Sequence, residues 1–163
     1  MANPVYLWLT NQDGAVLNGP VRKLGCEGSI EVVALSHSIS IPTDSNTGQL
    51  NGERTHEPFK ITKVVDKTSN YLLQAVTTGQ SFQSAEIREY EVNSNGELVV
   101  KKITTLENVK VVRIDKLMES IKDQSREAQV PYELISLRYE KITWLFKEGT
   151  ISHSDSWQER RAG

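Results

Sequence analysis

The chain has 163 residues, 37% of them hydrophobic and 25% charged, which is typical of one globular domain and excludes a disordered chain. Its net charge of -2 gives no electrostatic reason to expect nucleic acid or an anionic membrane as a partner. The single cysteine, Cys26, excludes an intrachain disulfide, and no pattern pairs it with a general base.

The first third of the chain predicts strands divided by turns. Residues Val5 to Thr10 read as a short strand that ends at the turn residues 11–14. Residues Ser29 to Ile41 read as a longer strand, whose apolar residues lie first on even and then on odd numbers. In its second half the even positions are all serine, so this face meets water or a surface that must stay small and polar. His37 lies on the opposite, apolar phase, which favours a hydrogen-bonded core or interface histidine over a metal ligand.

Residues Pro42 to Pro58 form a polar segment that is rich in Thr, Asp, Ser, Asn and Gly and cannot pack a core. We expect a long projecting loop or a loose hairpin here. An irregular segment of this length in a compact domain usually has a function of its own.

The middle of the chain predicts a strand over Phe59 to Val65, followed by the one clear helix. Thr68 or Ser69 suits the N-cap, and Gly79 suits the end of the helix. A helix of about ten residues is marginal alone, so its apolar stripe must dock on the sheet. The stripe consists of Tyr71, Leu72, Ala75 and Val76.

A hairpin is predicted next, with strands Ser84 to Val92 and Leu98 to Thr104 around the turn 93–96. Residues Leu106 to Ile114 read as a further strand. The polar segment Asp115 to Gln129 reads as a second excursion, with apolar residues spaced as on one helical turn.

Residues Glu133 to Trp157 carry the strongest strand signal, a long strand, a turn at 147–150 and a second strand. Near Glu140 and Lys141 the large apolar residues change from odd to even positions, a shift of one residue in the alternation. A straight strand from Leu134 to Lys147 would extend about 45 Å. A domain of this size has a radius of gyration of about 15 Å, so such a strand would extend beyond the core. We therefore expect a bulge that bends the strand from one sheet to the other, although a strand buried on both faces gives a similar pattern.

These elements predict a mainly β fold, either a barrel or a two-sheet sandwich, in a single domain over residues 1–163 with a frayed tail at 158–163. No nucleotide-binding, nucleophile-elbow or zinc-protease motif occurs, and the three histidines lack metal-like spacing. Glu31, Glu86 and Glu140 could supply a glycosidase pair, but charged strand residues more often mark solvated faces or ion pairs. We therefore expect no enzyme, no cofactor and no metal.

Four stretches of the sequence resemble the haemolysin-coregulated protein family, Hcp, and specifically its enterobacterial branch. They follow one another in one order with matching spacing, and the resemblance covers residues 2–157. The stretches are SIEVVALSHSISIPTDSNTGQLNGERTHEPF, KVVDKTSNYLLQAVTTGQSFQSAEI, LENVKVV and LRYEKITWLFKEGTISHSDSW.

The resemblance implies a two-sheet β-barrel with one short helix packed on its side and long projecting loops, as in phage tail tube proteins. It implies a structural subunit whose hexameric rings stack into the inner tube of the type VI secretion system. The implied partners are further copies of the chain, the sheath, the spike or tip proteins and small effectors. The alternative function is a secreted receptor or chaperone ring that binds effectors in its lumen.

The N-terminal residues lack the basic start and apolar core of a signal peptide, and no window is apolar enough to span a bilayer. We expect a protein made in the bacterial cytoplasm without membrane insertion. The resemblance implies export through the type VI system, which bypasses the general secretion pathway.

A ring of identical subunits needs two different patches on each chain. We expect Ser36 and Ser38 to line the lumen, since Ser36 matches the family position implicated in cargo contact. The odd-numbered residues Leu35, His37 and Ile39 are then expected to be buried. The segment 42–58 is expected to contact a neighbouring subunit or a stacked ring, through Thr43, Asp44, Asn46, Glu53 and Arg54.

Overall fold

The computed structural model describes residues 3–120, 122 and 130–157, and within them it is mainly β with one α-helix. The predicted tail at 158–163 lies outside the described residues. The elements are β1 (Val5–Asn11), β2 (Ile30–Val32), β3 (Ala34–Ser36), β4 (Ile39–Ser40), β5 (Thr55–His56), β6 (Phe59–Val64), α1 (Ser69–Thr78), β7 (Ser81–Val92), β8 (Leu98–Leu117), β9 (Tyr132–Arg138), β10 (Lys141–Phe146), a 3-10 turn (Glu148–Thr150) and β11 (Ile151–Ser156).

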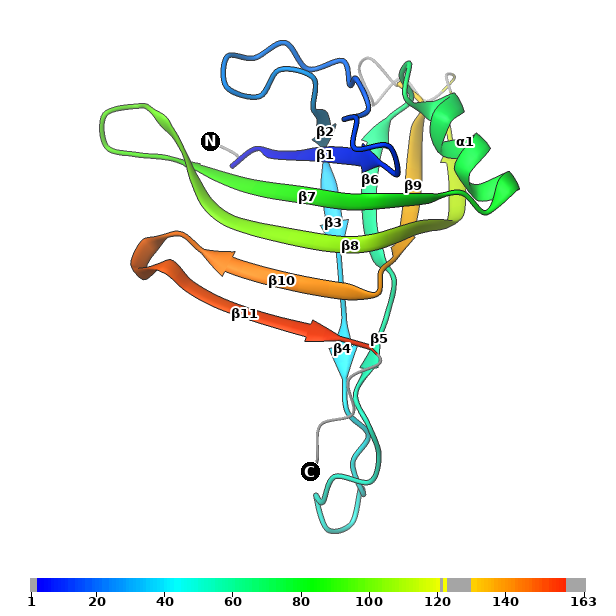
Figure 1. Ribbon diagram of the computed structural model, residues 1–163, viewed down its shortest axis with the longest axis vertical. Helices are drawn as coiled ribbons and strands as arrows, with labels where there is room; N and C mark the ends of the chain where they lie inside the picture. The colour runs from blue at the N-terminus through cyan, green and yellow to red at the C-terminus, as the bar shows by residue number, and fades with distance from the viewer. Residues whose placement is uncertain (1–2, 121, 123–129, 158–163) are drawn as a thin grey trace.

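The strands form two layers around one core (Figure 1). One layer contains β1, β7, β8, β10 and β11, and β3, β6 and β9 run behind it almost at right angles. All these strands belong to one antiparallel sheet of nine strands. Seven of them follow the order β2-β1-β7-β8-β9-β6-β3, and the other two, the β10–β11 hairpin, are attached through β8. The predicted mainly β fold with two layers is confirmed.

The sheet turns from one layer to the other along β8. The first half of β8, up to Glu107, pairs with β10, and its second half, from Lys110, pairs with β9. Between these halves Asn108 has a positive φ of 53°, and its side-chain amide donates to Glu140 at 2.7 Å. The predicted bend at Glu140 and Lys141 is therefore confirmed, but as a break between two strands and not as a bulge within one, since β9 ends at Arg138 and β10 begins at Lys141.

The chain also changes partners within the predicted strand Ser29 to Ile41. Strand β2 pairs with β1, whereas β3 pairs with β6, and only Val33 separates β2 from β3. The two edge strands of the sheet, β2 and β3, are thus connected by the chain at Val33 and not by hydrogen bonds to each other. The switch from even to odd apolar positions marks this change of partner, and the predicted single strand is three short ones.

Helix α1 begins at Ser69 and ends before Gly79, as predicted. Gly79 has a φ of 71° and donates its N–H to the carbonyl of Ala75, a left-handed cap that glycine adopts without strain. Leu72 and Ala75 are 1% exposed, but Tyr71 is 57% exposed, so its predicted burial is wrong. The helix packs mainly on β8 through a narrow strip of side chains, and its first residue, Ser69, also bonds Glu133 of β9. Successive helical residues point about 100° apart, so Tyr71, next to Leu72, points away from that strip.

The core lies between the two layers and consists of aliphatic side chains with Phe59, Phe82 and Tyr139. Each fully buried Leu or Ile side chain stabilises the fold by about 1.5–3 kcal/mol relative to exposure. The aliphatic residues below 2% exposure include Leu7, Leu9, Ile30, Ile61, Ile87, Leu106, Ile135, Leu137 and Ile142.

Two polar excursions leave this core. Residues 37–58, here called the arm, form a hairpin with the short ladder β4–β5 and a bridge between Thr43 and Leu50, and Figure 1 shows it projecting from the body. This confirms the predicted loose hairpin. Residues 115–117 extend β8, so the predicted helical turn does not begin there, and residues 121 and 123–129 lie outside the described part.

Candidate assembly surface and its polar anchor

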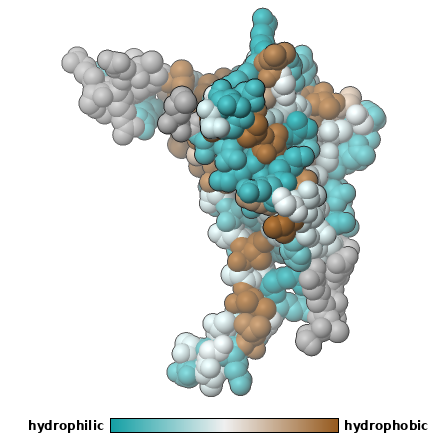
Figure 2. Space-filling view, turned by 90° about the vertical axis from the view of Figure 1, so that its left-hand side faces the viewer, coloured by the Kyte–Doolittle hydropathy of each residue, from teal (hydrophilic) through white to brown (hydrophobic). Residues whose placement is uncertain are grey.

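Large apolar side chains lie along β3 and the arm, and no strand of the described part of the chain covers them. These residues, the apolar stretch, are Leu35 (39% exposed), Ile39 (40%), Ile41 (42%) and Leu50 (65%). Figure 2 shows brown, apolar surface along the projecting arm. Leu35 and Ile39 were predicted to be buried, and in the single chain this is wrong, because among the described strands β3 pairs only with β6 and β4 only with β5. The neighbouring face of the same segment is also exposed, since Ser36, Ser38 and Ser40 are all open to solvent.

The predicted interface residues of the arm fall into two groups. Thr43, Asp44 and Asn46 lie toward the tip, where the Asp44 carboxylate accepts the backbone N–H of Asn46 at 2.8 Å and so shapes the turn. Glu53 is exposed. Arg54 lies at the base instead, where its Nε donates to Asp155 Oδ2 at 2.5 Å and its terminal nitrogen to the Ser156 carbonyl at 2.7 Å. Arg54 thus binds the arm to β11 of its own chain.

A connected set of side chains, here called the polar anchor, joins the arm to the body. The Tyr139 hydroxyl, between β9 and β10, lies 2.9 Å from His37 Nε2 and 2.5 Å from His56 Nδ1. His56 Nε2 lies 2.8 Å from Asp155 Oδ2, the oxygen that also accepts from Arg54. His56 is buried, so the arm is a projecting hairpin with a buried base.

Burial and charge fix the ionisation of the anchor. Burial raises the pKa of Tyr139 to about 12, so Tyr139 stays a neutral hydroxyl. Burial also raises the pKa of Asp155, but hydrogen bonds from Arg54 and His56 outweigh it and hold that pKa below its ordinary value. Burial, with the nearby charge of His56, lowers the pKa of His37. The anchor therefore holds one carboxylate and one permanent cation, Arg54, at neutral pH.

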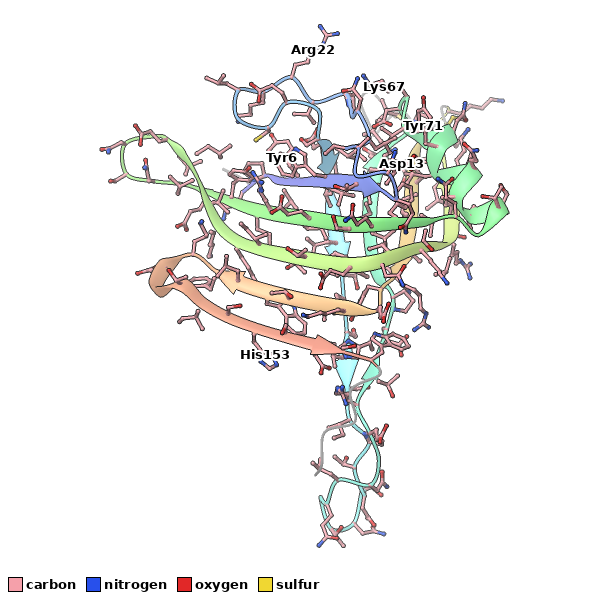
Figure 3. The ribbon with its side chains drawn as sticks, viewed as in Figure 1. Tyr6, Asp13, Arg22, Lys67, Tyr71 and His153 are labelled. Carbon is pink, nitrogen blue, oxygen red and sulfur yellow. The ribbon has the colours of Figure 1, made fainter. Side chains whose placement is uncertain are left out.

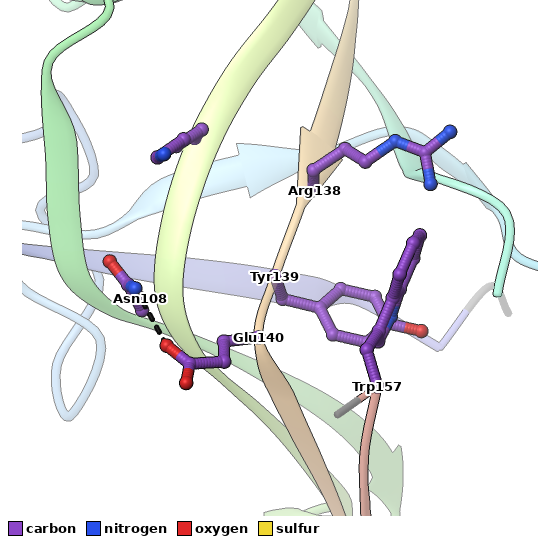
Figure 4. Close-up of a pocket in the computed structure, with 6 residues that line it drawn as sticks. Asn108, Arg138, Tyr139, Glu140 and Trp157 are labelled. Atoms are coloured by element: carbon purple, nitrogen blue, oxygen red, sulfur yellow. Dashed lines mark hydrogen bonds between the residues drawn. The ribbon is translucent and has the colours of Figure 1, made fainter. Parts of the chain in front are cut away.

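Aromatic packing covers the outer side of the anchor. Trp157 stacks on His56 with ring centroids 5.5 Å apart, and the Arg138 guanidinium lies 4.8 Å from the centre of the Trp157 ring. Arg138 also donates to the His56 carbonyl at 3.2 Å. Beside these groups lies an open pocket of about 340 Å³, drawn in Figure 4 with the Asn108–Glu140 hydrogen bond. It is lined by Asn108, Lys110, Arg138, Tyr139, Glu140 and Trp157.

A second buried polar cluster fixes the start of α1. Lys63, which has no solvent exposure, places its Nζ 2.5 Å from Glu133 Oε1, directly across the β6–β9 ladder. The Ser69 hydroxyl donates to the same carboxylate oxygen at 2.6 Å, and Asp66 Oδ1 lies 3.3 Å from the Lys63 ammonium. This cluster holds the first helical residue against the sheet.

Sequence reasoning found only part of these clusters. The prediction that His37 is a hydrogen-bonded core or interface histidine is confirmed. The other anchor residues carried no local signal, because His56 and Arg54 lie in a segment of loop composition. Glu86 and Glu140, named as possible catalytic acids, bind Arg88 and Asn108 respectively, and Glu31 is exposed.

Three further features of the described residues concern metal binding, membrane spans and the single cysteine. Among them no group of three or more His, Cys, Asp or Glu side chains is placed to hold a metal ion. No helix in the described ranges is long and apolar enough to cross a membrane. Cys26 is buried against Tyr6 and Tyr90 in a small cluster of its own.

Comparison with known proteins decides the family. The family model described as type VI secretion system effector, Hcp, matches residues 6–146. The chain belongs to the Hcp family. A mutant of Hcp1 from E. coli EAEC 042 is 49% identical, with a TM-score of 0.86 over 96% of this chain and 99% of that one.

Relatives from another genus agree with this assignment. The chain is 31% identical to the major exported protein of Pseudomonas aeruginosa PAO1 over 172 residues, which cover 100% of both proteins. The secreted protein Hcp3 from Pseudomonas aeruginosa is 28% identical, with a TM-score of 0.76 over 97% of this chain and 100% of that one. The resemblance found in the four sequence stretches is confirmed.

Proposed function

We propose that this chain is a structural subunit of the type VI secretion inner tube, which assembles as hexameric rings that stack and are expelled from the cell. The observation that carries the proposal, beside family membership, is the apolar stretch, which is exposed in the single chain on β3, on β4 and on the arm beyond β4. Edge strands with uncovered apolar residues are a liability in a monomer and a binding surface in an assembly.

The energetics of the apolar stretch support subunit contact. Full burial of a Leu or Ile side chain is worth about 1.5–3 kcal/mol, so covering residues that are already about half buried adds about 1 kcal/mol each. Four such residues at every interface of a closed ring give a cooperative assembly, because each subunit uses one patch to bind the next. Ring formation should therefore depend on concentration and require the arm.

The proposal extends to localisation and to partners. The subunit is made in the cytoplasm and leaves through the type VI system, where the sheath surrounds the tube and spike or tip proteins cap it. Thr43, Asp44 and Asn46, toward the arm tip, and the exposed Glu53 are proposed to contact a neighbouring subunit or a stacked ring. The subunit has no catalytic role.

A second function, a receptor or chaperone ring for small effectors, is favoured by the serine face. Ser36 and Ser38 are exposed, small and uncharged, and they adjoin Leu35 and Ile39. We propose that these serines line the lumen, where small side chains leave room for cargo. Protection of an effector from proteolysis by the assembled ring, and its loss in a ring with a filled lumen, distinguishes this function from a purely structural one.

Native mass spectrometry of the purified chain over a range of concentrations tests the assembly. The wild-type chain should give hexamers. A variant with Ile39→Glu and Ile41→Glu should remain folded by circular dichroism but become monomeric. Leu24→Glu is the matched control, because Leu24 is 91% exposed in a loop away from the arm and its change should leave the hexamer intact. A wild-type chain that is monomeric at every concentration would refute the proposal.

A further inference from the structure

The anchor between arm and body depends on one hydroxyl group that two histidines share. His37, after β3, and His56, on β5, both belong to the arm, and Tyr139 belongs to the body. The Tyr139 oxygen lies 2.9 Å from His37 Nε2 and 2.5 Å from His56 Nδ1. A hydroxyl has one proton to donate, so the protonation of the two rings decides whether every bond can form.

With both histidines neutral the chain of hydrogen bonds is complete. His37 Nε2–H donates to the Tyr139 oxygen, and the Tyr139 hydroxyl donates to His56 Nδ1. His56 Nε2–H then donates to the Asp155 carboxylate, 2.8 Å away. All bonds run in one direction, from His37 toward Asp155.

One added proton is also accommodated. If His56 is protonated, its Nδ1–H donates to the Tyr139 oxygen, and the hydroxyl turns to donate to Nε2 of a neutral His37. The imidazolium of His56 then forms an ion pair with Asp155. The direction of the bonds has reversed between the two histidines, and each polar group still has its partner.

A second proton cannot be accommodated. With both rings protonated, His37 Nε2–H and His56 Nδ1–H point at the same oxygen, and the hydroxyl proton has no acceptor in this chain of bonds. A buried polar group without a partner is costly, and two imidazolium ions would share one hydroxyl.

The charged groups around the anchor do not offset the second proton. Arg54 comes from the arm, Arg138 from the end of β9 and Asp155 from β11. Lys110 of β8 and Glu140, between β9 and β10, line the open pocket beside Tyr139, so the described surroundings hold three cations and two carboxylates. Phe59 of β6 contributes only an aromatic ring, whereas Trp157 after β11 also hydrogen-bonds Tyr139 through its indole N–H and so adds a further donor, not an acceptor, at the shared oxygen.

We propose that the anchor is an acid-sensitive latch, which takes up one proton without opening and releases the arm from the body when a second proton arrives. Given the proposed tube function, release would detach the arm from its neighbours and make stacked rings labile to acid. The lowered pKa of His37 sets the direction of the effect. Because His37 binds its proton less readily when folded, its contribution is complete above its ordinary value of 6.5 and is lost as the pH falls below it.

Hydrogen–deuterium exchange of the arm amides, corrected for the intrinsic rate at each pH, tests the latch. In the wild-type chain, protection at residues 37–58 should fall about tenfold between about pH 7 and about pH 5, while β7 and β8 stay protected. His37→Gln should keep the arm protected to the lower pH, since the amide both donates and accepts but takes no proton. His153→Gln is the matched control, because His153 is exposed on β11 and stacks on Trp144 outside the anchor (Figure 3). It should behave as the wild type.

Several outcomes would overturn the latch. These are an arm that exchanges alike at both pH values, a His37→Gln curve that superimposes on the wild type, or an equal shift in His153→Gln. If His37→Gln does not fold, Tyr139→Phe replaces it, and without the shared hydroxyl it should lose arm protection already at neutral pH. Light scattering of the same samples reports ring formation separately, so a chain that forms no rings refutes the tube proposal without deciding the latch.

Discussion

Replacing Glu133 by glutamine should destabilise the folded chain by about 3 kcal/mol. The Lys63 ammonium is fully buried, and its shortest contact is the Glu133 carboxylate at 2.5 Å. Removing one partner of a buried ion pair typically costs about 3–5 kcal/mol, because an uncompensated charge stays in the interior. The lower end applies here, since Asp66 Oδ1 remains 3.3 Å from the ammonium and the Val64 carbonyl accepts from it at 3.0 Å.

Urea denaturation at one fixed protein concentration measures this effect, because assembly would otherwise shift the apparent stability. For a domain of this size 1 kcal/mol corresponds to about 2–4 °C, so Glu133→Gln should lower the melting temperature by about 6–12 °C. Glu107→Gln is the matched control. Glu107 pairs with Lys141 at 3.9 Å with both side chains about half exposed, and such pairs contribute about 0–1 kcal/mol.

The reasoning also predicts the double variant. Lys63→Met with Glu133→Leu removes both charges and keeps apolar volume, so it should recover more than half of the stability lost in Glu133→Gln. A Glu133→Gln variant within about 1 kcal/mol of the wild type, or one no worse than Glu107→Gln, would show that the cluster is already solvated and would refute the argument.

Three further outcomes are expected. Ser36→Gln should spare ring formation but reduce effector retention in a protection assay, since the bulky side chain enters the lumen face; a variant that fails to fold would reverse the face assignment. Replacing residues 43–53 by a short Gly-Ser turn, with Arg54 and His56 kept, should leave the melting temperature almost unchanged, because loop closure changes by only about 0.6 kcal/mol per doubling, yet abolish tubes in electron microscopy. Asp155→Asn should make the free energy of unfolding, measured by denaturation, fall less steeply as the pH drops below about 4. The folded pKa of Asp155 lies below its ordinary value of 3.8, so the carboxylate stabilises the fold above that pH and loses this contribution as the pH falls.

The alternation of apolar residues predicted the bends of this fold because it reports which face of a strand is covered. One slip fell within Ser29 to Ile41 and the other near Glu140, and at both places the chain ends one strand and begins the next. At Val33 the partner changes from β1 to β6, and at Glu140 the chain passes from one half of β8 to the other. A slip in period therefore indicated a break between two strands in both cases, with a change of partner strand at Val33 and a step along the same partner, β8, at Glu140.

The polar clusters could not be predicted in the same way. Arg54 and Asp155 are 101 residues apart in sequence, and His56 and Tyr139 are 83 apart, so no local spacing connects them. Composition was misleading for His56, because a polar, proline-bounded segment indicates a solvated loop. Lys63 occupies a buried position of β6 that a periodic pattern assigns to an apolar residue, and only its partner across the ladder, Glu133, explains it.

The apolar residues after Val33 connect the alternation of the strands with the polar anchor. Leu35, Ile39 and Ile41 alternate as a covered strand face does, yet the single chain leaves them about 40% exposed. The alternation and the exposure are compatible if the cover belongs to another molecule, because a strand pattern reports burial in the functional state and not only in the monomer. The anchor supports this explanation from the other side, since buried hydrogen bonds hold the arm out from the body instead of letting the apolar stretch fold back on it. A subunit that assembles needs both properties, an uncovered apolar surface and a rigid base that presents it.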